Sequence, residues 1–474
     1  MACPPRYASW LCGLALILLG PQVSHAQDTT LVRVDVQGAI ERALAISPEV
    51  GGVAVVRDFA ARRSRFAWAA RFLPEFTGTS AHAAAPGLDI PADNTFDDEA
   101  LYLNPDVRND WNNLRPLNQF EFEIVQPIWT GGQVNANIRA ARHAVDIEEG
   151  RVQDKALEVA LRTGELYYNL LLASSLARLT TEAGEVVDQA ETTVRDLLEE
   201  GDPEVDDADL FQVLITKEEY QRRVVEVDQG QLTAQAALTR QLLLPPASLA
   251  APDTSILEPL AWTLESLEVY LTQAQQRRPE LSQAEAGVAA RDALVDAARS
   301  DYFPKVGVVL SGRITLAAGR VRQPNPYVGD PFRSRRLRVG VGVRQQLNFL
   351  QTRGAVEEAV AEREEVRFQL EAATQLVQFE VEQAYRQVLT AEAALNAGAE
   401  SLRLSGEWLR TEQINFDLGL GSTENLILAV QANLELQAQS FEAVRDYNVA
   451  VLRLLDATGT LIEVVQSGML VDPL

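Results

Sequence analysis

The chain has very little cysteine, methionine, histidine or lysine. Its two cysteines, Cys3 and Cys12, lie in the first 26 residues, which have the pattern of a secretory signal peptide: a basic residue, a short apolar run and a small-residue cleavage site. The apolar run is too short to span a bilayer, and no triplet of the lipid-anchor type precedes Cys12. After removal of residues 1–26 the exported chain has no thiol and can form no disulfide. One methionine and two histidines remain, so a soft-metal site is not expected.

Long apolar runs and positive charge are also scarce. No run of transmembrane-helix length follows residue 26, so an integral membrane protein of this sequence has to be a β-barrel. Lys and Arg number 42 against 67 Asp and Glu, for a formal net charge of −25. Loss of the single cation of the signal segment, Arg6, makes the charge −26. This balance argues against nucleic acid binding and is typical of a solvated acidic surface.

Catalytic motifs are absent as well. The sequence contains no phosphate loop, no paired-cysteine motif, no His-Glu-x-x-His and no Gly-x-Ser-x-Gly. His82, on a predicted strand, and His143, on a predicted helix, are most simply structural. Carboxylates at helical spacing are abundant, and a solvated helix face explains them. We therefore expect no enzyme activity, no catalytic residue, no cofactor and no metal site.

The chain does contain a tandem repeat. Pro48-Glu49 is answered by Pro279-Glu280, Tyr167 by Tyr385, and Gly201 by Gly419. All matched positions are separated by 216 to 231 residues, which indicates a duplicated unit. We predict a first structural repeat over residues 27–258 and a second over residues 259–474.

Each repeat is read as a helix, two strands, a very long helix, a glycine break and a shorter helix, so the fold class is mixed α and β. Polar, turn-rich loops are expected over residues 86–115 and 319–335. The predicted strands cover residues 74–85 and 118–130 in the first repeat and 304–316 and 336–349 in the second, and the helical hairpins cover about 132–243 and 354–458.

Along the predicted strands, apolar residues alternate with polar or small ones, with a period of two. In 337–344 one face is Leu337, Val339, Val341 and Val343, and the other is arginine and glycine. A soluble half-buried sheet gives the same alternation. Arginines and glutamates on the second face favour a membrane barrel, and so do aromatic residues that flank the strand pairs: Trp129 and Phe349 on one side, and Phe72, Tyr302 and Phe303 on the other. Four strands cannot close a barrel, so several chains have to contribute.

The predicted helix lengths suggest a cylinder. Two short helices placed end to end match one long helix of about 100 Å, so long and two-piece helices can alternate around a wall. Large residues recur every seventh position from Val381 to Phe416, which predicts left-handed supercoiling. An ordinary coiled-coil dimer is the alternative. The glycine break at Gly419-Leu-Gly421 is then a hairpin tip.

At this point the sequence resembles the TolC-like outer membrane efflux proteins (outer membrane factors). The resemblance rests on the repeat, the Pro-Glu after each short helix, Gln-Pro-Ile-Trp-Thr-Gly-Gly at 126–132, the two tyrosines, and Gly419. It implies a homotrimer with a 12-stranded outer-membrane β-barrel, four strands per chain, continuous with a long periplasmic α-helical barrel. It also implies a passive exit duct of a tripartite efflux pump or a type I secretion system, in the outer membrane of a Gram-negative bacterium. The implied partners are a periplasmic adaptor (membrane fusion) protein, an inner-membrane transporter and outer-membrane lipid.

The hairpin tips supply the candidate site residues. Exposed leucines on a turn suit a partner surface. The alternative is that they only make contacts that stabilise their own hairpin. The predicted adaptor-docking tip is Gly201, Leu418, Gly419, Leu420, Gly421, Ser422 and Thr423.

Residues 199–209 hold seven carboxylates in eleven positions, and a ring of such segments in a trimer would focus negative potential, although helix capping and solubility also explain them. The predicted acidic aperture is Glu199, Glu200, Asp202, Glu204, Asp206, Asp207 and Asp209.

A second hypothesis from a different class stays open. The chain could be a non-conducting periplasmic coiled-coil scaffold whose strands form a soluble sheet. The two hypotheses differ in whether the apolar strand faces meet lipid.

Overall fold

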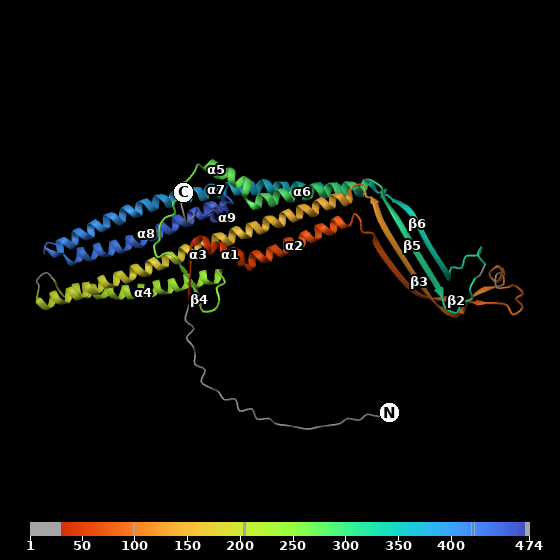
Figure 1. Ribbon diagram of the computed structural model, residues 1–474, viewed down its shortest axis with the longest axis horizontal. Coiled ribbons are helices and arrows are strands. Elements are labelled where there is room, and N and C mark those ends of the chain that lie inside the picture. Colours follow the sequence, from red (N-terminus) through yellow and green to blue (C-terminus); the bar gives the residue numbers. More distant parts are fainter. Residues whose placement is uncertain are drawn as a thin grey trace, which may run out of the picture.

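A computed structural model describes residues 30–97, 100–201, 205–323, 325–418, 420 and 422–469. The predicted signal peptide, residues 1–26, lies outside these residues. The chain is elongated, with a β-sheet at one end, helical hairpin tips at the other, and a cluster of short elements near the middle (Figure 1). The prediction of a mixed α and β fold is confirmed.

Four antiparallel strands form the sheet at one end, in the order β2-β3-β5-β6. Their bounds are β2 Glu75–Asp89, β3 Arg108–Trp129, β5 Lys305–Ala317 and β6 Arg333–Arg344. Since opposite residues in an antiparallel pair share a face, the register places Val339 with Leu310, and Leu310 with Ile124, on one face.

The first strand pair is longer than the sequence predicted. β3 begins at Arg108, not near 118, and β2 continues to Asp89, because residues 87–89 pair with 108–110 beyond a register shift at Pro86 and Gly87. This extension carries polar residues without a clear period-two pattern, so it was assigned to a loop. β6 ends at Arg344 instead of 349, and the helix that follows begins at Phe349 instead of 354.

The distal loops pack on each other through Arg320, which is buried. Its guanidinium donates to the carbonyls of Pro86 and Gly87 and to Oδ1 of Asn109, and lies 4.1 Å from the ring centroid of Phe332. The loop between β5 and β6 is thereby fastened to the β2–β3 hairpin.

Helices account for the remainder of the length. The two long ones are α3 Gln133–Glu200 and α7 Phe349–Asp417, of 68 and 69 residues. The shorter ones are α1 Val36–Ile46, α2 Pro48–Ala69, α4 Asp207–Gln241, α5 Leu267–Arg277, α6 Pro279–Arg299, α8 Thr423–Ala457 and α9 Leu461–Gln466, with short 3-10 turns at Leu101–Leu103 and Ser300–Tyr302.

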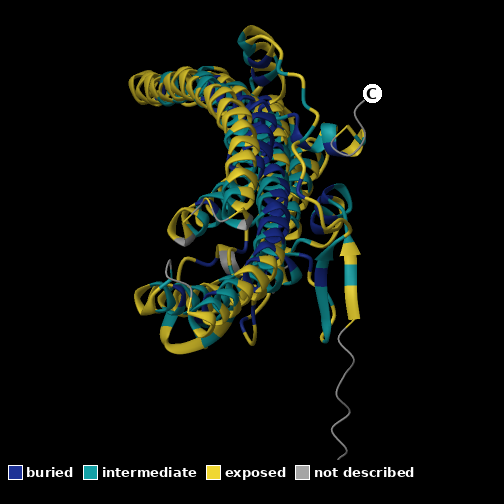
Figure 2. Ribbon diagram, turned by 90° about the vertical axis from the view of Figure 1, so that its left-hand side faces the viewer, coloured by how far each residue is buried: buried dark blue, intermediate teal, exposed yellow. Residues whose placement is uncertain are grey.

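The long helices alternate with two-piece ones. Near the sheet, neighbouring helices run in the order α2, α3, α6, α7, and toward the tips in the order α4, α3, α8, α7. Thus α2 and α4 together flank α3, while α6 and α8 together fill the space between α3 and α7. Seen from the tips, these helices form an arc with a concave and a convex side (Figure 2).

A proline begins the sheet-side helix of each two-piece pair, α2 in one and α6 in the other. Ser47 caps α2 by accepting from the N–H of Val50, and Pro48 opens that helix; Pro279 opens α6 in the same way. A proline is tolerated at a first helical position because that N–H has no helical partner. The same order of elements, short helix, helix, two strands, long helix and returning helix, therefore occurs twice.

The hydrophobic core lies at the middle of the chain. It is built by α1, α3, α5, α7, α8 and α9, and its fully buried side chains include Leu170, Val381, Val388, Leu452 and Leu454. α3 approaches α8 closely at Gly164, where an added Cβ would lie 2.5 Å from Cδ1 of Leu452. Tyr167 is buried there and donates to Oδ1 of Asp253 at 3.0 Å.

A small parallel sheet beside this core was not predicted. β1 Thr30–Val34 pairs in parallel with β4 Ser248–Pro252. These two strands lie on the convex side of the arc (Figure 2). The concave side is formed by the long and two-piece helices.

Candidate functional site

The sheet carries an exposed apolar face. Leu337, Val339, Val341 and Val343 of β6 are 68–75% exposed, and Phe76, Phe120 and Ile314 of the other strands are exposed as well. Burying such side chains is worth about 1.5–3 kcal/mol each. A face this continuous is therefore expected to meet another apolar surface.

Aromatic side chains gather at the end of the sheet that joins the helices. The rings of Trp129 and Phe303 lie 6.3 Å apart, and those of Tyr302 and Phe349 stack at 6.4 Å. The sequence prediction placed these residues on two sides of the strand pairs. That placement is wrong: because the strands are hairpins, residues before the first strand and after the second meet at one end.

The opposite face of the sheet is polar. Arg313 pairs with Glu121 across β5 and β3 at 2.6 Å, and Arg338 lies on the same face, opposite Ser311. His82 is on the apolar face, where its Nδ1 lies 2.7 Å from Oδ1 of Asn118. No group of described residues could hold a metal ion.

Both hairpin tips lie at the end of the chain remote from the sheet (Figure 1). Gly201 ends α3 with φ of +74°, a conformation that glycine adopts without strain. Leu418 and Leu420 are exposed, the latter by 79%. Ser422 caps α8, whose first residue is Thr423, by accepting from the N–H of Asn425.

The carboxylates of the first tip have different surroundings. Glu199 and Glu200 are exposed at the end of α3, and Asp207 is exposed at the start of α4. Asp206 and Asp209 form a capping box, in which each carboxylate accepts from the other's backbone N–H. Four predicted site residues lie outside the residues that the structure describes: Asp202, Glu204, Gly419 and Gly421.

An ion cluster that the sequence reading missed lies where α8 ends and α6 begins. The side chain of Arg278 is 9% exposed. It donates to the backbone carbonyl of Asp456 at 3.2 Å and to Glu380 at 2.5 Å, and pairs with Glu280 at 3.0 Å. A cation at this position also suits the negative end of the α8 dipole. These carboxylates were interpreted as part of a solvated helix face, and that interpretation is wrong for this cluster.

The cluster shifts proton affinities. Burial raises the pKa of Asp456 from its ordinary 3.8 to about 6, and the carboxylates of Glu280, Asp154 and Glu380 act in the same direction. Burial, followed by repulsion from Glu280, also raises the pKa of Asp154. Arg278 opposes both shifts without cancelling them. We call the place where α8 ends beside the start of α6 the joint. Its carboxylates therefore hold more negative charge than its one arginine, Arg278, neutralises.

Comparison with known proteins accounts for this architecture. Residues 270–460 match the family model described as outer membrane efflux protein. No protein of curated function matches the chain. None of the described helices is both long and apolar enough to cross a membrane.

Solved structures match almost the whole chain. The Campylobacter jejuni CmeC outer membrane channel is 16% identical, with a TM-score of 0.67 over 90% of this chain and 86% of that one. The Vibrio cholerae outer membrane protein VceC is 16% identical, with a TM-score of 0.68 over 90% and 96%. The open state of the Neisseria gonorrhoeae MtrE outer membrane channel is 14% identical, with a TM-score of 0.66 over 90% and 89%.

The chain thus has the fold of these solved outer membrane channels. Over residues 270–460 the chain matches the outer membrane efflux protein family, and the resemblance drawn from the sequence is confirmed by this match and by the shared fold. Proteins of this family are transport ducts and not enzymes.

Proposed function

We propose that the chain is one protomer of a homotrimeric exit duct in the outer membrane of a Gram-negative bacterium, extending into the periplasm. The duct would serve a tripartite efflux pump or a type I secretion system. The observation that carries this proposal is the exposed apolar sheet face, with Val339 75% and Val341 70% exposed. In a 12-stranded barrel of three chains, this face would meet lipid and the polar face would line water.

The free edges of the arc support ring closure. α2 and α4 form one edge and α7 forms the other, and apolar side chains on both are exposed. A head-to-tail ring would cover them. They include Phe59 and Phe66 on α2, Phe211 and Ile215 on α4, and Phe368 and Leu404 on α7.

A scaffold with a soluble sheet is the competing hypothesis. It would require another protein layer on the apolar sheet face, and within the described residues no helix covers that face (Figure 1). We therefore favour the duct.

A substitution on each face of β6 separates the two hypotheses. Val341→Arg puts a charge at mid-strand on the apolar face, which costs about 2–4 kcal/mol per chain at the bilayer midplane. Gly340→Ser is the matched control, because a Cβ there meets nothing within 4 Å on the other face. Loss of membrane-assembled trimer for Val341→Arg alone is the expected result. Equal assembly of both variants would refute the lipid-facing assignment.

We also propose that the tips dock a periplasmic adaptor protein, which connects the duct to an inner-membrane transporter. The exposed Leu418 and Leu420 support this, because apolar side chains on a turn remote from the core have no packing role within one chain. Ser422 would hold the turn that presents them, and Gly201 would hold the turn of the other hairpin.

The acidic aperture is proposed for the same end. Glu199, Glu200 and Asp207 are exposed and free of the capping box, so three copies would place a ring of carboxylates around the opening. Asp206 and Asp209 have a capping role that does not depend on such a ring.

A further inference from the structure

Two arginines end the apolar face of the sheet on the side remote from the helices. β6 begins at that end of the sheet (Figure 1). Because side chains of a strand alternate between faces, its residues Arg333 and Arg335 share a face with Leu337. The register agrees, since Arg335 lies opposite Ile314 of β5 and Arg333 lies opposite Leu316. Both arginine side chains are exposed, so they continue the apolar face toward the distal loops.

The other charged side chains of these strands lie on the opposite face. Up to the register shift at Pro86 and Gly87, alternation and register place there Glu75, Arg115, Glu121, Glu123, Lys305, Arg313, Arg336, Arg338 and Arg344. Within this part of the described strands, the apolar face has no carboxylate. Its only permanent charges are therefore two of the same sign, two residues apart on one strand.

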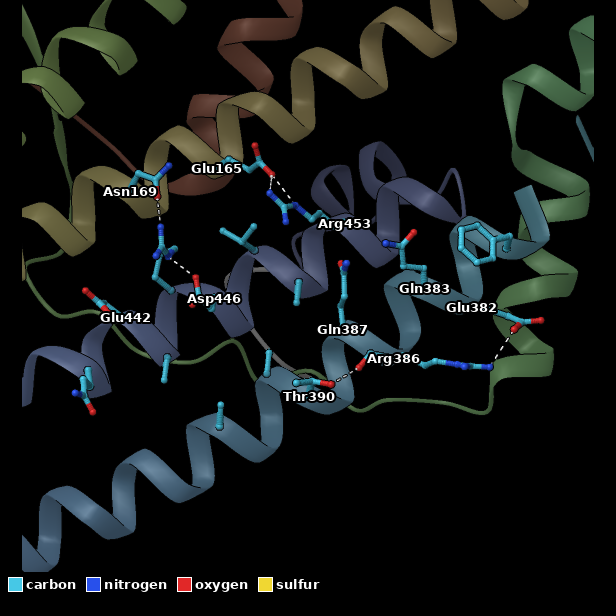
Figure 3. Close-up of a pocket in the computed structure, with 18 residues that line it drawn as sticks. Glu165, Asn169, Glu382, Gln383, Arg386, Gln387, Thr390, Glu442, Asp446 and Arg453 are labelled. Carbon is cyan, nitrogen blue, oxygen red and sulfur yellow. Dashed lines mark hydrogen bonds and ion pairs between the residues drawn. The ribbon is translucent and has the colours of Figure 1, made fainter. Parts of the chain in front are cut away.

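These two arginines have no partner in the chain. Among the described residues, the side chain of neither Arg333 nor Arg335 makes a hydrogen bond or an ion pair. Arginines on the helices give a contrast, in the groove of about 800 Å³ that α3, α7 and α8 line. Figure 3 shows Arg453 of this groove directed at Glu165, with an N···O distance of 2.8 Å. The charges on the apolar sheet face thus remain open to a ligand from outside the chain.

The position of the arginines along β6 corresponds to one boundary of a bilayer. Aromatic rings mark the other boundary, at the end of the sheet where Tyr302 and Phe349 stack. From Val343, the last apolar-face residue before these rings, Arg335 is eight residues away. This path is about 27 Å along the strand, or about 20 Å along the bilayer normal at a strand tilt of about 40°. Since the apolar band of a barrel is about 25 Å tall and starts at the rings, Arg335 lies near its remote edge.

Two neighbouring strands become polar at the same level, while β5 stays apolar there. The register places Asn118 of β3 and His82 of β2 on the row of Arg333, and Ser80 of β2 on the row of Arg335. The ring of His82 lies 2.7 Å from Oδ1 of Asn118 and 2.9 Å from Oγ of Ser80. These polar groups satisfy one another, whereas the arginines at the same level do not have such partners among the described residues.

We propose that Arg333 and Arg335 bind the phosphate groups of outer-leaflet lipid, whose acyl chains lie along Leu337 and Val339. A guanidinium presents two parallel N–H donors that match a phosphate. Side chains two residues apart on one face are separated by about 7 Å, which suits a headgroup with more than one phosphate. The inference rests on the proposed duct, in which the apolar face meets lipid.

Lipid binding to the purified protein in an uncharged detergent tests the proposal. Native mass spectrometry counts bound lipids during titration with diphosphoryl lipid A and with lipid A from which both phosphates have been removed. We expect the phosphorylated form to bind more tightly, and the double variant Arg333→Gln/Arg335→Gln to raise its Kd at least five-fold. The matched control is Arg336→Gln, which removes an exposed arginine of the same strand on the opposite face, and no change is expected.

A Kd for lipid A that is equal in the parent and the double variant overturns the proposal. An equal loss of affinity in Arg336→Gln also overturns it, because the site is assigned to one face of the strand. If the double variant yields little trimer, Arg335→Gln alone provides the same comparison. Inorganic phosphate distinguishes the two sources of the ligand. We expect it not to displace lipid A at equal concentration, and displacement would indicate a site for free phosphate and refute the lipid site.

Conductance of the same preparations in planar bilayers separates this proposal from the duct. Conducting protein whose lipid A binding does not depend on the two arginines refutes the lipid site and leaves the duct. Arginine-dependent binding by protein that does not conduct refutes the duct as a channel, and it leaves a lipid-facing sheet with its phosphate site.

Discussion

Replacing Asp456 by asparagine is expected to stabilise the protein at neutral pH. Asp456 is half-buried in the joint at the end of α8, where burial raises its pKa to about 6. The neighbouring carboxylates Glu280, Asp154 and Glu380 raise it further, and Arg278 opposes them. The ionised carboxylate is therefore disfavoured in the folded state, and an uncharged isostere removes that penalty.

The sign and size of the effect follow from the pKa difference. The folded-state pKa of about 6 lies above the ordinary value of 3.8, so between these values the folded state holds a proton that the unfolded state has lost. The contribution to the free energy of unfolding is full below about pH 4 and is lost as the pH rises through about 6. About two pKa units correspond to about 3 kcal/mol, which is an upper limit because solvent in the recess screens the charges.

Thermal unfolding of the detergent-solubilised protein at pH 7.5 and pH 4.5 measures this difference. Asp456→Asn should raise the apparent Tm by a few degrees at pH 7.5 and by much less at pH 4.5. Asp228→Asn, an exposed position on α4, serves as the control and should shift neither value. A lower Tm at pH 7.5, or an equal shift at both pH values, would refute the reasoning.

Three further predictions concern the tips and the core. Leu420→Asp should abolish export in cells while trimer yield on heat-modified gels stays at the parent level; loss of the trimer would make the tip a structural element. Purified trimers should favour cations over anions in planar bilayers, and Glu200→Lys, which suits a helix C-terminus, should reduce that preference in reversal-potential measurements; an unchanged preference would exclude the aperture as its source. Gly164→Val should destabilise the core by about 1–3 kcal/mol because its Cβ would meet Leu452 at 2.5 Å, and an unchanged Tm would show that the core relaxes without cost.

The long elements could be predicted because their signals are local. Heptad spacing and the glycine at 201 predicted α3 and α7 to within a few residues at most ends, and Pro48 and Pro279 predicted where their shorter neighbours begin. The apolar face of β6 follows from strict alternation of valine with glycine and arginine. Each signal lies within one segment, so no knowledge of its neighbours was required.

The features that were missed depend on contacts between distant segments. β1 and β4 are five residues each and are separated by more than 200 positions, so neither carries a pattern that identifies its partner. The joint cluster is assembled from α3, α6, α7 and α8, and along the sequence each carboxylate looks like any other exposed helical acid. The groove that α3, α7 and α8 line depends in the same way on three helices meeting.

The two joints of the duplicated unit can be compared with each other. At the first joint Arg42 donates to the carbonyl of Leu242 at the end of α4, at 3.1 Å, and Arg162 of α3 pairs with Glu49 of α2 at 2.7 Å. At the second joint, Arg278 provides both contacts, one to the end of α8 and one to Glu380 of α7.

The repeat offsets make the charge change explicit. Glu380 stands where the first repeat has Arg162, and Asp456 stands where it has Arg240, at offsets of 218 and 216. Two positions that are basic in the first repeat are thus acidic in the second, while both joints have a guanidinium at the end of the returning helix, from the non-matching positions Arg42 and Arg278. A cation that accompanies the helix terminus is therefore the common requirement of both joints. The acid excess belongs to the second joint alone, which shares Gln383, Gln387 and Arg453 with the groove that α3, α7 and α8 line.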